Sequence, residues 1–424
     1  MLIKNARFVL TPEKTLENKN IVVKDSRIES IGGCDKSEEV IDASNHIVLP
    51  GLVNMHTHAS MNLLRGVSDD KKLQKWLQED IWPLEEKLDG EKCYWGAMHA
   101  FTEMIKTGTT CFSDMYFFMD KVAEAAEDIG IRGYLGHGML DLGEEQRRKK
   151  DLKKSRKIVK DIGKLSDRIN PMVTPHSCET CSDELLLKAR EMADRNDIPL
   201  HMHLCETHDE VEKLIKERGR RPVEHIKQLG LLDGKFIGAH GVHLTVEDIK
   251  TLSKKEASIV HNPCSNMKLT SGVAPVPDMM QKGLNVCLGT DGAASNNNLD
   301  MFEEMKFVGL LHKLNASDPT TMPIEDISKL PWTNADMALD RKIGRLEQGY
   351  TADLILVDLD YIKMNPVHSP LSNLIYSGAE VDTTIIDGEI VMRNGELTMV
   401  DENKIKRKAG EFAEELVSCP HSED

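Results

Sequence analysis

Residues 47–58 read Ile47-Val48-Leu49-Pro50-Gly51-Leu52-Val53-Asn54-Met55-His56-Thr57-His58, an apolar run with almost no polar side chain before two histidines. Continuous apolar character is typical of a strand buried on both faces, as in a parallel sheet or barrel. His56 and His58 are two residues apart, so on a strand both side chains leave from the same face. Two imidazoles at one strand end are natural metal ligands, and the run therefore predicts a metal centre there.

Seven further strand-like runs follow, and amphipathic helical stretches separate them. This alternation is typical of βαβ units in a parallel sheet. The runs cover residues 108–113, 131–136, 170–176, 198–204, 235–240, 257–261 and 285–291. Eight parallel strands with intervening helices predict an α/β protein with a (β/α)8 TIM barrel, which we place at residues 50–344. A doubly wound open sheet is the alternative, but its Gly-rich dinucleotide fingerprint is absent from the sequence.

Both ends of the chain have a different, β-rich texture. Short β-type runs punctuated by turn residues fill residues 1–45, and similar runs return at 353–358 and 381–388. These ends predict a small β-sandwich domain assembled from residues 1–49 and 345–424. Residues 401–417 predict a charged surface helix that packs on this domain.

Metal-ligating side chains follow six of the eight expected strands. They are His56, His58, His176, His203, His240, His261 and Asp291. Chemistry gathers at the C-terminal strand ends of such barrels, and one polar residue there is commonplace, whereas six such ends are not. Three imidazoles with one carboxylate suit a zinc site that leaves a coordination position for water. His201, one step deeper on the same strand face as His203, is expected to be structural.

Several motifs resemble those of a known enzyme family. They are residues 50–58, Trp82-Pro83-Leu84-Glu85, Thr174-Pro175-His176-Ser177, His203-Leu204-Cys205-Glu206-Thr207, Ala239-His240-Gly241-Val242-His243 and Gly289-Thr290-Asp291-Gly292. The first resembles the opening of the amidohydrolase superfamily. The others resemble its 5′-methylthioadenosine/S-adenosylhomocysteine deaminase branch, which includes the 5′-deoxyadenosine deaminases. The resemblance covers nearly the whole chain and implies hydrolytic deamination of adenosine-type nucleosides to inosine analogues and ammonia.

The resemblance also implies roles for individual residues. A single zinc ion would be held by His56, His58, His203 and Asp291. His240 would hold and orient the attacking water, and Asp291 would accept its proton. Glu206 would protonate N1 of adenine as general acid, which makes C6 electrophilic.

Two further residues would bind the nucleoside. His176 would donate a hydrogen bond to the purine, and Glu85 would accept hydrogen bonds from the ribose hydroxyls. Binuclear relatives carry a carboxylated lysine at the end of strand 4, where this chain has His176, which supports one metal ion. Three histidines and one aspartate also suit Fe²⁺ or Mn²⁺.

The loop after the third barrel strand bears on the 5′ substituent. Members that accept the homocysteine carboxylate are expected to carry an arginine there, whereas this chain has Gly136-His137-Gly138-Met139. Histidine is a poorer bidentate carboxylate partner than arginine. Arg147 and Arg148 are the other candidate partners. The sequence therefore favours 5′-deoxyadenosine, 5′-methylthioadenosine or adenosine over S-adenosylhomocysteine. Trp76, in the helix-like stretch 71–88, is either a packing residue or a cover for the nucleoside.

Other readings stay open. The chain could be another amidohydrolase, such as a guanine or cytosine deaminase or a triazine hydrolase, or an inactive metal-holding binding module. Cys178 and Cys181 have metal or redox spacing but lack a second cysteine pair. The zinc nucleobase-deaminase signature also places its His-x-Glu before the cysteines, whereas His208-Asp209-Glu210 follows them.

Composition limits the partners of this chain. It has 424 residues and a formal net charge of −16, which argues against nucleic acid or an anionic membrane as a partner. The start lacks an apolar signal core and no run is long enough to span a bilayer, so we expect a cytoplasmic protein. The expected partner is a small-molecule nucleoside. Relatives are commonly homo-oligomers, and we expect the same here.

Overall fold

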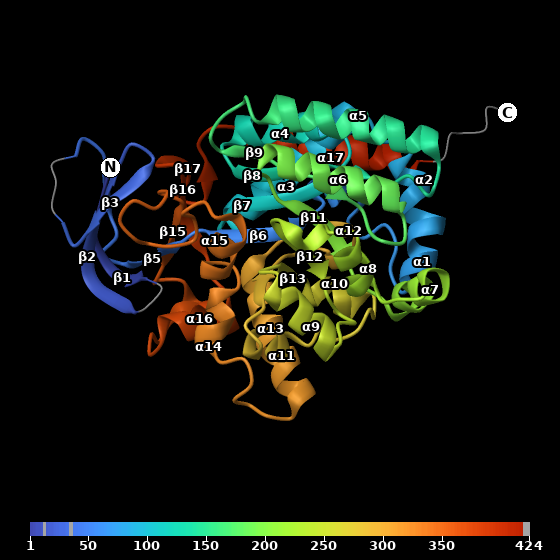
Figure 1. The fold of residues 1–424 in the computed structure, drawn as a ribbon. Helices are drawn as coiled ribbons and strands as arrows, with labels where there is room; N and C mark the ends of the chain where they lie inside the picture. Colours follow the sequence, from blue (N-terminus) through green and yellow to red (C-terminus); the bar gives the residue numbers. More distant parts are fainter. Residues whose placement is uncertain (12–13, 34–36, 419–424) are drawn as a thin grey trace.

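A (β/α)8 barrel forms the centre of the molecule (Figure 1). The structure is a computed structural model that describes residues 1–11, 14–33 and 37–418. In that part of the chain the barrel strands are β6 (Leu52–Thr57), β7 (Thr109–Tyr116), β8 (Arg132–Met139), the paired short strands β9 (Ile169–Pro171) and β10 (Thr174–Pro175), β11 (Leu200–Leu204), β12 (Phe236–His240), β13 (Ser258–His261) and β14 (Asn285–Leu288). All eight expected strand regions are therefore present.

The barrel closes through two isolated bridges. Strands β6, β7, β8 and β10 are parallel neighbours, and so are β11 to β14. Val173 bridges to Leu200 and Thr57 bridges to Asp291, both in parallel orientation, which joins the two groups of strands into a ring. The bridge at Asp291 brings the loop after the last strand against the end of the first. The predicted TIM barrel is confirmed.

Helices surround the barrel strands (Figure 1). They are α3 (Gly90–Lys106), α4 (Met119–Ile129), α5 (Glu145–Ile162), α6 (Asp183–Asn196), α7 (His208–Arg218), α8 (Pro222–Gln228), α9 (Val246–Lys254), α10 (Pro263–Lys268), α11 (Val276–Gln281), α12 (Ala293–Asn296), α13 (Met301–Ala316), α14 (Ile324–Lys329) and α15 (Thr333–Leu339), with the 3-10 turn η3 (Leu231–Asp233). Local signals set their ends: Asp89 caps α3, and Thr245 with Asp248 forms a capping box at α9. No helix among the described residues is long and apolar enough to cross a membrane.

Strands from both termini build a second sheet. They are β1 (Leu2–Leu10), β2 (Thr15–Lys24), β3 (Arg27–Ile31), β4 (Val40–Asp42), β5 (His46–Pro50), β15 (Leu354–Asp358), β16 (Val381–Ile386), β17 (Glu389–Arg393) and β18 (Glu396–Leu397). Strand β5 lies between β1 and β15 and so joins the two ends of the chain. The sheet curls until the Ile28 amide donates to the Tyr350 carbonyl at 2.9 Å. Ile21, Val48 and Leu356 share the enclosed core, which confirms the β-sandwich built from both termini.

The apolar run 47–58 is two strands rather than the single strand expected. Strand β5 ends at Pro50 and pairs with β15, whereas β6 begins at Leu52 and pairs with β7. Gly51 lies between them, and a Cβ there would come within 2.1 Å of Thr110 Oγ1. Because both strands are buried, the run is apolar throughout and reads as one strand, although the predicted domain boundary between residues 49 and 50 lies close to the junction.

The helix expected near the C-terminus is present as α17 (Glu402–Val417), but its expected packing partner was wrong. The helix lies on α3 and on the 3-10 segment η1 (Ala59–Leu64), which follows β6, rather than on the terminal sheet (Figure 1). Lys106 Nζ of α3 forms a salt bridge with Glu402 Oε2 at 2.8 Å. Ile405 and Leu416 of α17 pack into the apolar core of the barrel. The apolar face of α17 was visible in the sequence, but not the surface that it covers.

The helix-like stretch 71–88 is an irregular helix. It consists of α1 (Leu73–Lys75), a π-helical segment η2 (Trp76–Ile81) and α2 (Trp82–Glu85). Pro83 has no amide hydrogen and its ring crowds the preceding turn, which explains why the regular α-helical pattern is interrupted just before it. The remaining elements are η4 (Ile362–Met364) and α16 (Pro370–Ser377).

Candidate metal centre and active site

The four predicted metal ligands converge at the C-terminal end of the barrel. His58 Nε2 lies 3.4 Å from His203 Nε2. Asp291 Oδ1 lies 3.3 Å from His58 Nε2 and 3.5 Å from His56 Nε2. Tetrahedral ligands at zinc distances of ~2.0–2.1 Å are separated from one another by about 3.4 Å. The spacing of these atoms therefore fits a tetrahedral metal ion.

Hydrogen bonds leave the Nε2 atoms of these histidines free for a metal. His58 Nδ1 lies 2.8 Å from the Met115 carbonyl, and His203 Nδ1 lies 2.9 Å from the His176 carbonyl. A carbonyl only accepts, so each Nδ1 carries the proton and each Nε2 presents a lone pair. The buried Nε2 of His56 has no hydrogen-bond partner within the described chain, which a metal ion would satisfy.

Asp291 is held so that one of its oxygens faces the histidines. Its Oδ2 accepts from Ser265 Oγ at 2.7 Å and from Ser295 Oγ at 2.8 Å, which leaves Oδ1 toward the ligands. Its φ of 62° lies in the left-handed region, which is uncommon for a non-glycine residue. Burial opposes ionisation, but the neighbouring His56, His58 and His240 hold the pKa of Asp291 well below its usual value.

His201 stands behind the metal ligands. Its Nε2 lies 3.1 Å from His56 Nδ1, so the pair fixes the orientation of the His56 ring. Burial, followed by the charge of His56, lowers the pKa of His201 well below its usual value. This contact fits the structural role expected for His201.

His240 is the last residue of β12 and borders the same centre. Its Nε2 lies 3.7 Å from Glu206 Oε2. The side-chain amides of Asn266 and Asn262 donate to its Nδ1 at 3.0 and 3.3 Å, which places the proton of the neutral ring on Nε2. Burial lowers the pKa of His240, which favours the neutral ring. His240 therefore offers an N–H donor to the space shared with Glu206.

Glu206 is a carboxyl group that keeps its proton into the neutral range. Burial and the nearby Asp291 charge raise its pKa to about 8, against a lowering contribution from Ser271. Its Oε1 accepts from Ser271 Oγ at 3.4 Å, and its backbone amide donates to Glu210 Oε2 at 2.9 Å. A divalent cation in the centre would favour the ionised form and lower this pKa. The group can thus donate and regain a proton near neutral pH.

Glu85 and His176 come from separate elements. Glu85, on α2, accepts a hydrogen bond from the Tyr116 hydroxyl at 2.6 Å, and burial raises its pKa to about 7. His176 follows β10, and its ring centroid lies 4.7 Å from that of the metal-ligand candidate His203. Burial lowers the pKa of His176 to about 4, so its ring is neutral. Its Nδ1 contacts Thr180 Oγ1 at 2.9 Å, which orients the ring.

Sequence reasoning missed the functional end of the second barrel strand. That run was expected to end at Ser113, whereas β7 continues to Tyr116. The Met115 carbonyl accepts a hydrogen bond from His58, and the Tyr116 hydroxyl donates one to Glu85. Asp114 Oδ2 accepts a hydrogen bond from the Ala59 amide at 3.1 Å. Extending the strand through these residues would have found them. The serines that hold Asp291 were also missed, and no spacing in the sequence marks them.

The charged residues after the third strand bond one another. Arg148 lies 3.1 Å from Asp141 and 2.8 Å from Glu184. Arg147, which is half exposed, lies 3.0 Å from Glu144. The other candidate in this region, His137, is buried with its Nε2 3.4 Å from Asp151 Oδ1. Each candidate partner for a substrate carboxylate thus already lies beside a carboxylate of the chain itself.

Several other sequence candidates lie away from the metal ligands or in the core. His261 is fully buried, with its Nε2 3.3 Å from that of His312 on α13. Trp76 is buried and donates to the Ser68 carbonyl at 3.2 Å, contacts that favour a packing role over a cover for the nucleoside. Cys178 and Cys181 are buried thiols, and neither belongs to a possible metal-binding group in the described part of the chain.

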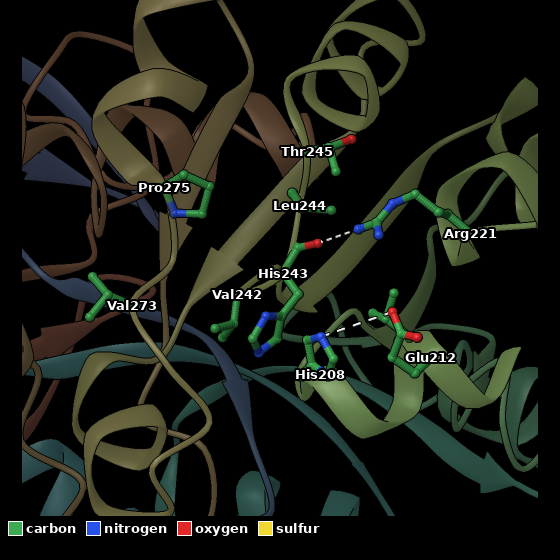
Figure 2. A pocket seen from close by; sticks show the side chains of 10 residues that line it. His208, Glu212, Arg221, Val242, His243, Leu244, Thr245, Val273 and Pro275 are labelled. Atoms are coloured by element: carbon green, nitrogen blue, oxygen red, sulfur yellow. Dashed lines mark hydrogen bonds and ion pairs between the residues drawn. The ribbon is translucent and has the colours of Figure 1, made fainter. Parts of the chain in front are cut away.

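A surface cavity of about 390 Å³ lies beside the Glu206 loop (Figure 2). His208 and His243 line it with their ring centroids 5.9 Å apart, and Arg221 donates to the His243 carbonyl. His243 Nε2 donates to the Ser271 carbonyl at 2.8 Å, so the cavity wall also supports the partner of Glu206. None of the predicted metal or substrate residues lines this cavity.

The chain is similar to known deaminases over its full length. The model of the amidohydrolase family matches residues 47–391. A 5′-deoxyadenosine deaminase of Methanopyrus kandleri is 45% identical over 97% of this chain and 98% of the relative. A 5-methylthioadenosine/S-adenosylhomocysteine deaminase of Thermococcus sibiricus is 43% identical over 92% of this chain and 94% of the relative. The crystal structure of an adenosine deaminase from Xanthomonas campestris with bound zinc has a TM-score of 0.93 and 31% identity, covering 98% of each chain.

Proposed function

The chain belongs to the amidohydrolase family, and we propose that it is a zinc-dependent deaminase that converts 5′-deoxyadenosine and related adenosines into inosine analogues and ammonia. Family membership confirms the resemblance found in the sequence. One observation carries the proposal: Glu206, a carboxyl group with its pKa raised to about 8, lies beside His240 and the His/Asp cluster. A proton donor next to a metal centre is what hydrolytic removal of an amino group requires.

One zinc ion per subunit would be held by His56, His58, His203 and Asp291. When bound, zinc polarises oxygen and lowers the pKa of water to about 7. The zinc-containing Xanthomonas structure supports this metal, while Fe²⁺ and Mn²⁺ suit the same ligands. His240 Nε2–H would donate to the attacking water and orient it, and Asp291 Oδ1 would accept the water proton.

Glu206 would act as general acid toward the base. Its proton passes to N1 of adenine, which makes C6 electrophilic, and water adds to C6. Collapse of the tetrahedral carbon then returns the proton of the C6 hydroxyl to Glu206, while Asp291 passes its proton to the amino group, which leaves as ammonia and yields the hypoxanthine ring. The contacts of the Glu206 carboxyl with Ser271 and His240 support this role, because they fix the carboxyl beside the predicted metal centre.

Glu85 and His176 would bind the rest of the substrate. The carboxylate of Glu85 would accept hydrogen bonds from the ribose hydroxyls, and His176, neutral and oriented by Thr180, would donate to the purine. Arg148 and Arg147, the two candidate arginines for a homocysteine carboxylate, are each paired with a carboxylate of the chain itself. We therefore infer that the preferred substrates carry a small, uncharged 5′ end.

Steady-state kinetics of the zinc-loaded protein test the substrate proposal. We expect kcat/KM to be highest for 5′-deoxyadenosine, 5′-methylthioadenosine or adenosine, and lowest for S-adenosylhomocysteine. A highest value for S-adenosylhomocysteine would contradict the inferred 5′ preference. Turnover of guanine, cytosine or a triazine, without turnover of any adenosine, would favour the other amidohydrolase reactions. Zinc binding without any turnover would favour a binding module.

We propose that residues 50–344 form the catalytic domain and that residues 1–49 and 345–424 form the second domain. We also propose that the protein is a homo-oligomer, as the family resemblance implies, and that it is located in the cytoplasm. Light scattering of the purified protein in solution measures the oligomeric state, and a monomer would contradict that part of the proposal.

A further inference from the structure

The hydroxyl of Tyr116 makes a short hydrogen bond to the carboxyl of Glu85. The distance from the Tyr116 hydroxyl to Glu85 Oε1 is 2.6 Å, within the range of a charge-assisted O–H···O bond. Such bonds are about twice as strong as those between neutral groups. Within the described chain, Tyr116 is the only residue that donates to this carboxyl. The orientation of the Glu85 side chain therefore depends on Tyr116.

Tyr116 also links Glu85 to the metal centre. Its ring centroid lies 5.8 Å from that of His58, and the neighbouring Met115 carbonyl accepts from His58 Nδ1 at 2.8 Å. Glu85 itself comes from α2, the irregular helical segment outside the barrel. The end of β7 thus orients His58, a metal-ligand candidate, through the Met115 carbonyl. It also orients Glu85 of α2 through the Tyr116 hydroxyl.

We propose that Tyr116 is a positioning residue for ribose recognition. Its hydroxyl holds Oε1 of Glu85, so that the carboxylate faces the 2′,3′-diol of the nucleoside with Oε2 free to accept. The proposal rests on the proposed function, in which Glu85 binds the ribose. A glutamate held before the substrate arrives loses less conformational freedom on binding, so Tyr116 lowers KM rather than raising kcat.

The test compares a substrate that has the diol with one that lacks it. For Tyr116→Phe we expect KM for 5′-deoxyadenosine to rise about tenfold, the loss expected for a hydrogen bond to a charged group, with kcat nearly unchanged. The kcat/KM for 2′,3′-dideoxyadenosine should not change, because Glu85 has no hydroxyl to bind in it. In a Glu85→Ala background, Tyr116→Phe should have no further effect on either substrate.

Tyr94→Phe is the matched control. The Tyr94 hydroxyl donates to Asp128 Oδ2 at 2.6 Å, so this variant removes an equally short hydroxyl–carboxyl bond that joins α3 to α4 and includes no predicted site residue. We expect its kinetics to equal those of the unaltered protein. Thermal unfolding of both variants shows whether either substitution changes stability.

The outcomes separate the positioning role from the proposed function. Unchanged KM in Tyr116→Phe, while Glu85→Ala raises KM for 5′-deoxyadenosine alone, would overturn the role of Tyr116 and leave the function intact. An equal loss for both substrates in Tyr116→Phe would indicate general disruption and would also overturn it. If Glu85→Ala affects both substrates equally, or if the unaltered protein deaminates no adenosine, the ribose-binding function fails as well.

Discussion

At the scale of single residues, each metal-ligand candidate makes a second contact that leaves one atom for the centre. The Nδ1 atoms of His58 and His203 donate to backbone carbonyls, and two serines occupy Oδ2 of Asp291. Such outer contacts fix the tautomer and the direction of a ligand. The arrangement therefore requires no rearrangement of these side chains before a metal ion binds.

The pairing of Arg148 leads to a prediction about the 5′ substituent. Arg148→Ala should change kcat/KM by the same factor for all four nucleosides, because Asp141 and Glu184 occupy its guanidinium. Parallel kinetics on the four substrates measure this, with the exposed Lys149→Ala as control. A selective loss with S-adenosylhomocysteine would show instead that Arg148 binds the homocysteine carboxylate.

Residue types at strand ends could be predicted, but their supporting contacts could not. His56, His58, His203, His240 and Asp291 each follow an apolar run, and strand geometry places such residues at one end of the barrel. Ser265 and Ser295 reach Asp291 only because the short helices α10 and α12, which follow β13 and β14, lie against it. Tyr116 was missed because the run at 108–113 was ended too early.

At the scale of elements, α13 holds together the two short helices that support Asp291. Glu304 of α13 is fully buried, accepts the backbone amide of Cys264 at 3.2 Å and accepts the side-chain amide of Asn296. Cys264 lies on α10, which carries Ser265, and Asn296 lies on α12, which carries Ser295. Glu304 thus connects the two helices whose residues Ser265 and Ser295 donate to the Asp291 carboxylate.

Removal of this link should weaken metal binding. Glu304→Ala should lower zinc affinity, by less than the roughly 10–100-fold that is usual when a direct partner of a metal ligand is lost. Glu304→Gln should lose less, because its carbonyl oxygen can still accept one of the two bonds. Competition with a chelator measures both affinities, with Glu303→Ala as the neighbouring control. Unchanged affinity in Glu304→Ala would refute the link between α13 and the centre.

The buried pair of His261 on β13 and His312 on α13 predicts acid sensitivity. Burial lowers the pKa of His312 to about 4, whereas an unfolded histidine titrates near 6.5. Between these values the unfolded chain binds more protons, so the free energy of unfolding falls as the pH falls from about 6.5 to about 4. The loss reaches about 3 kcal/mol.

His312→Gln should remove part of that pH dependence. Its thermal midpoint should fall less between about pH 7 and about pH 5 than that of the unaltered zinc-loaded protein. His208→Gln, at an exposed position, should leave the dependence unchanged. An equal fall of the thermal midpoint in all three proteins would show that the buried histidine pair does not cause the loss of stability at low pH.

Which segments form strands or helices could be predicted better than which surfaces those strands and helices pack against. Alternating apolar runs and amphipathic stretches gave the barrel strands, because each pattern reflects burial of a regular element. The apolar pattern reads β5 and β6 as one strand, since both are buried, although the predicted domain boundary between residues 49 and 50 lies close to their junction at Gly51. It also placed α17 on the wrong surface, because an apolar helix face does not specify which apolar surface it covers.

At the scale of the whole molecule, metal binding should stabilise the folded chain. Ligands on β6 and β11 and in the loop after β14 belong to distant parts of the sequence, so the unfolded chain does not present them together. An ion that binds only the folded form adds about 4 kcal/mol at a free concentration of 1,000 times its Kd. Zinc should therefore raise the thermal midpoint of the chelated protein, and His58→Ala should abolish that rise. A midpoint independent of zinc would contradict the metal centre.

The most direct test of the account follows the ultraviolet absorbance of 5′-deoxyadenosine in the presence of the zinc-loaded protein and of its Glu206→Gln variant. We expect an adenine-to-hypoxanthine shift with equimolar release of ammonia in the unaltered protein. The shift should be 10²–10⁴-fold slower in the variant at the same zinc content, because glutamine cannot donate the proton. An unaltered protein that holds zinc but produces no shift, or a variant as active as the unaltered protein, would contradict the account.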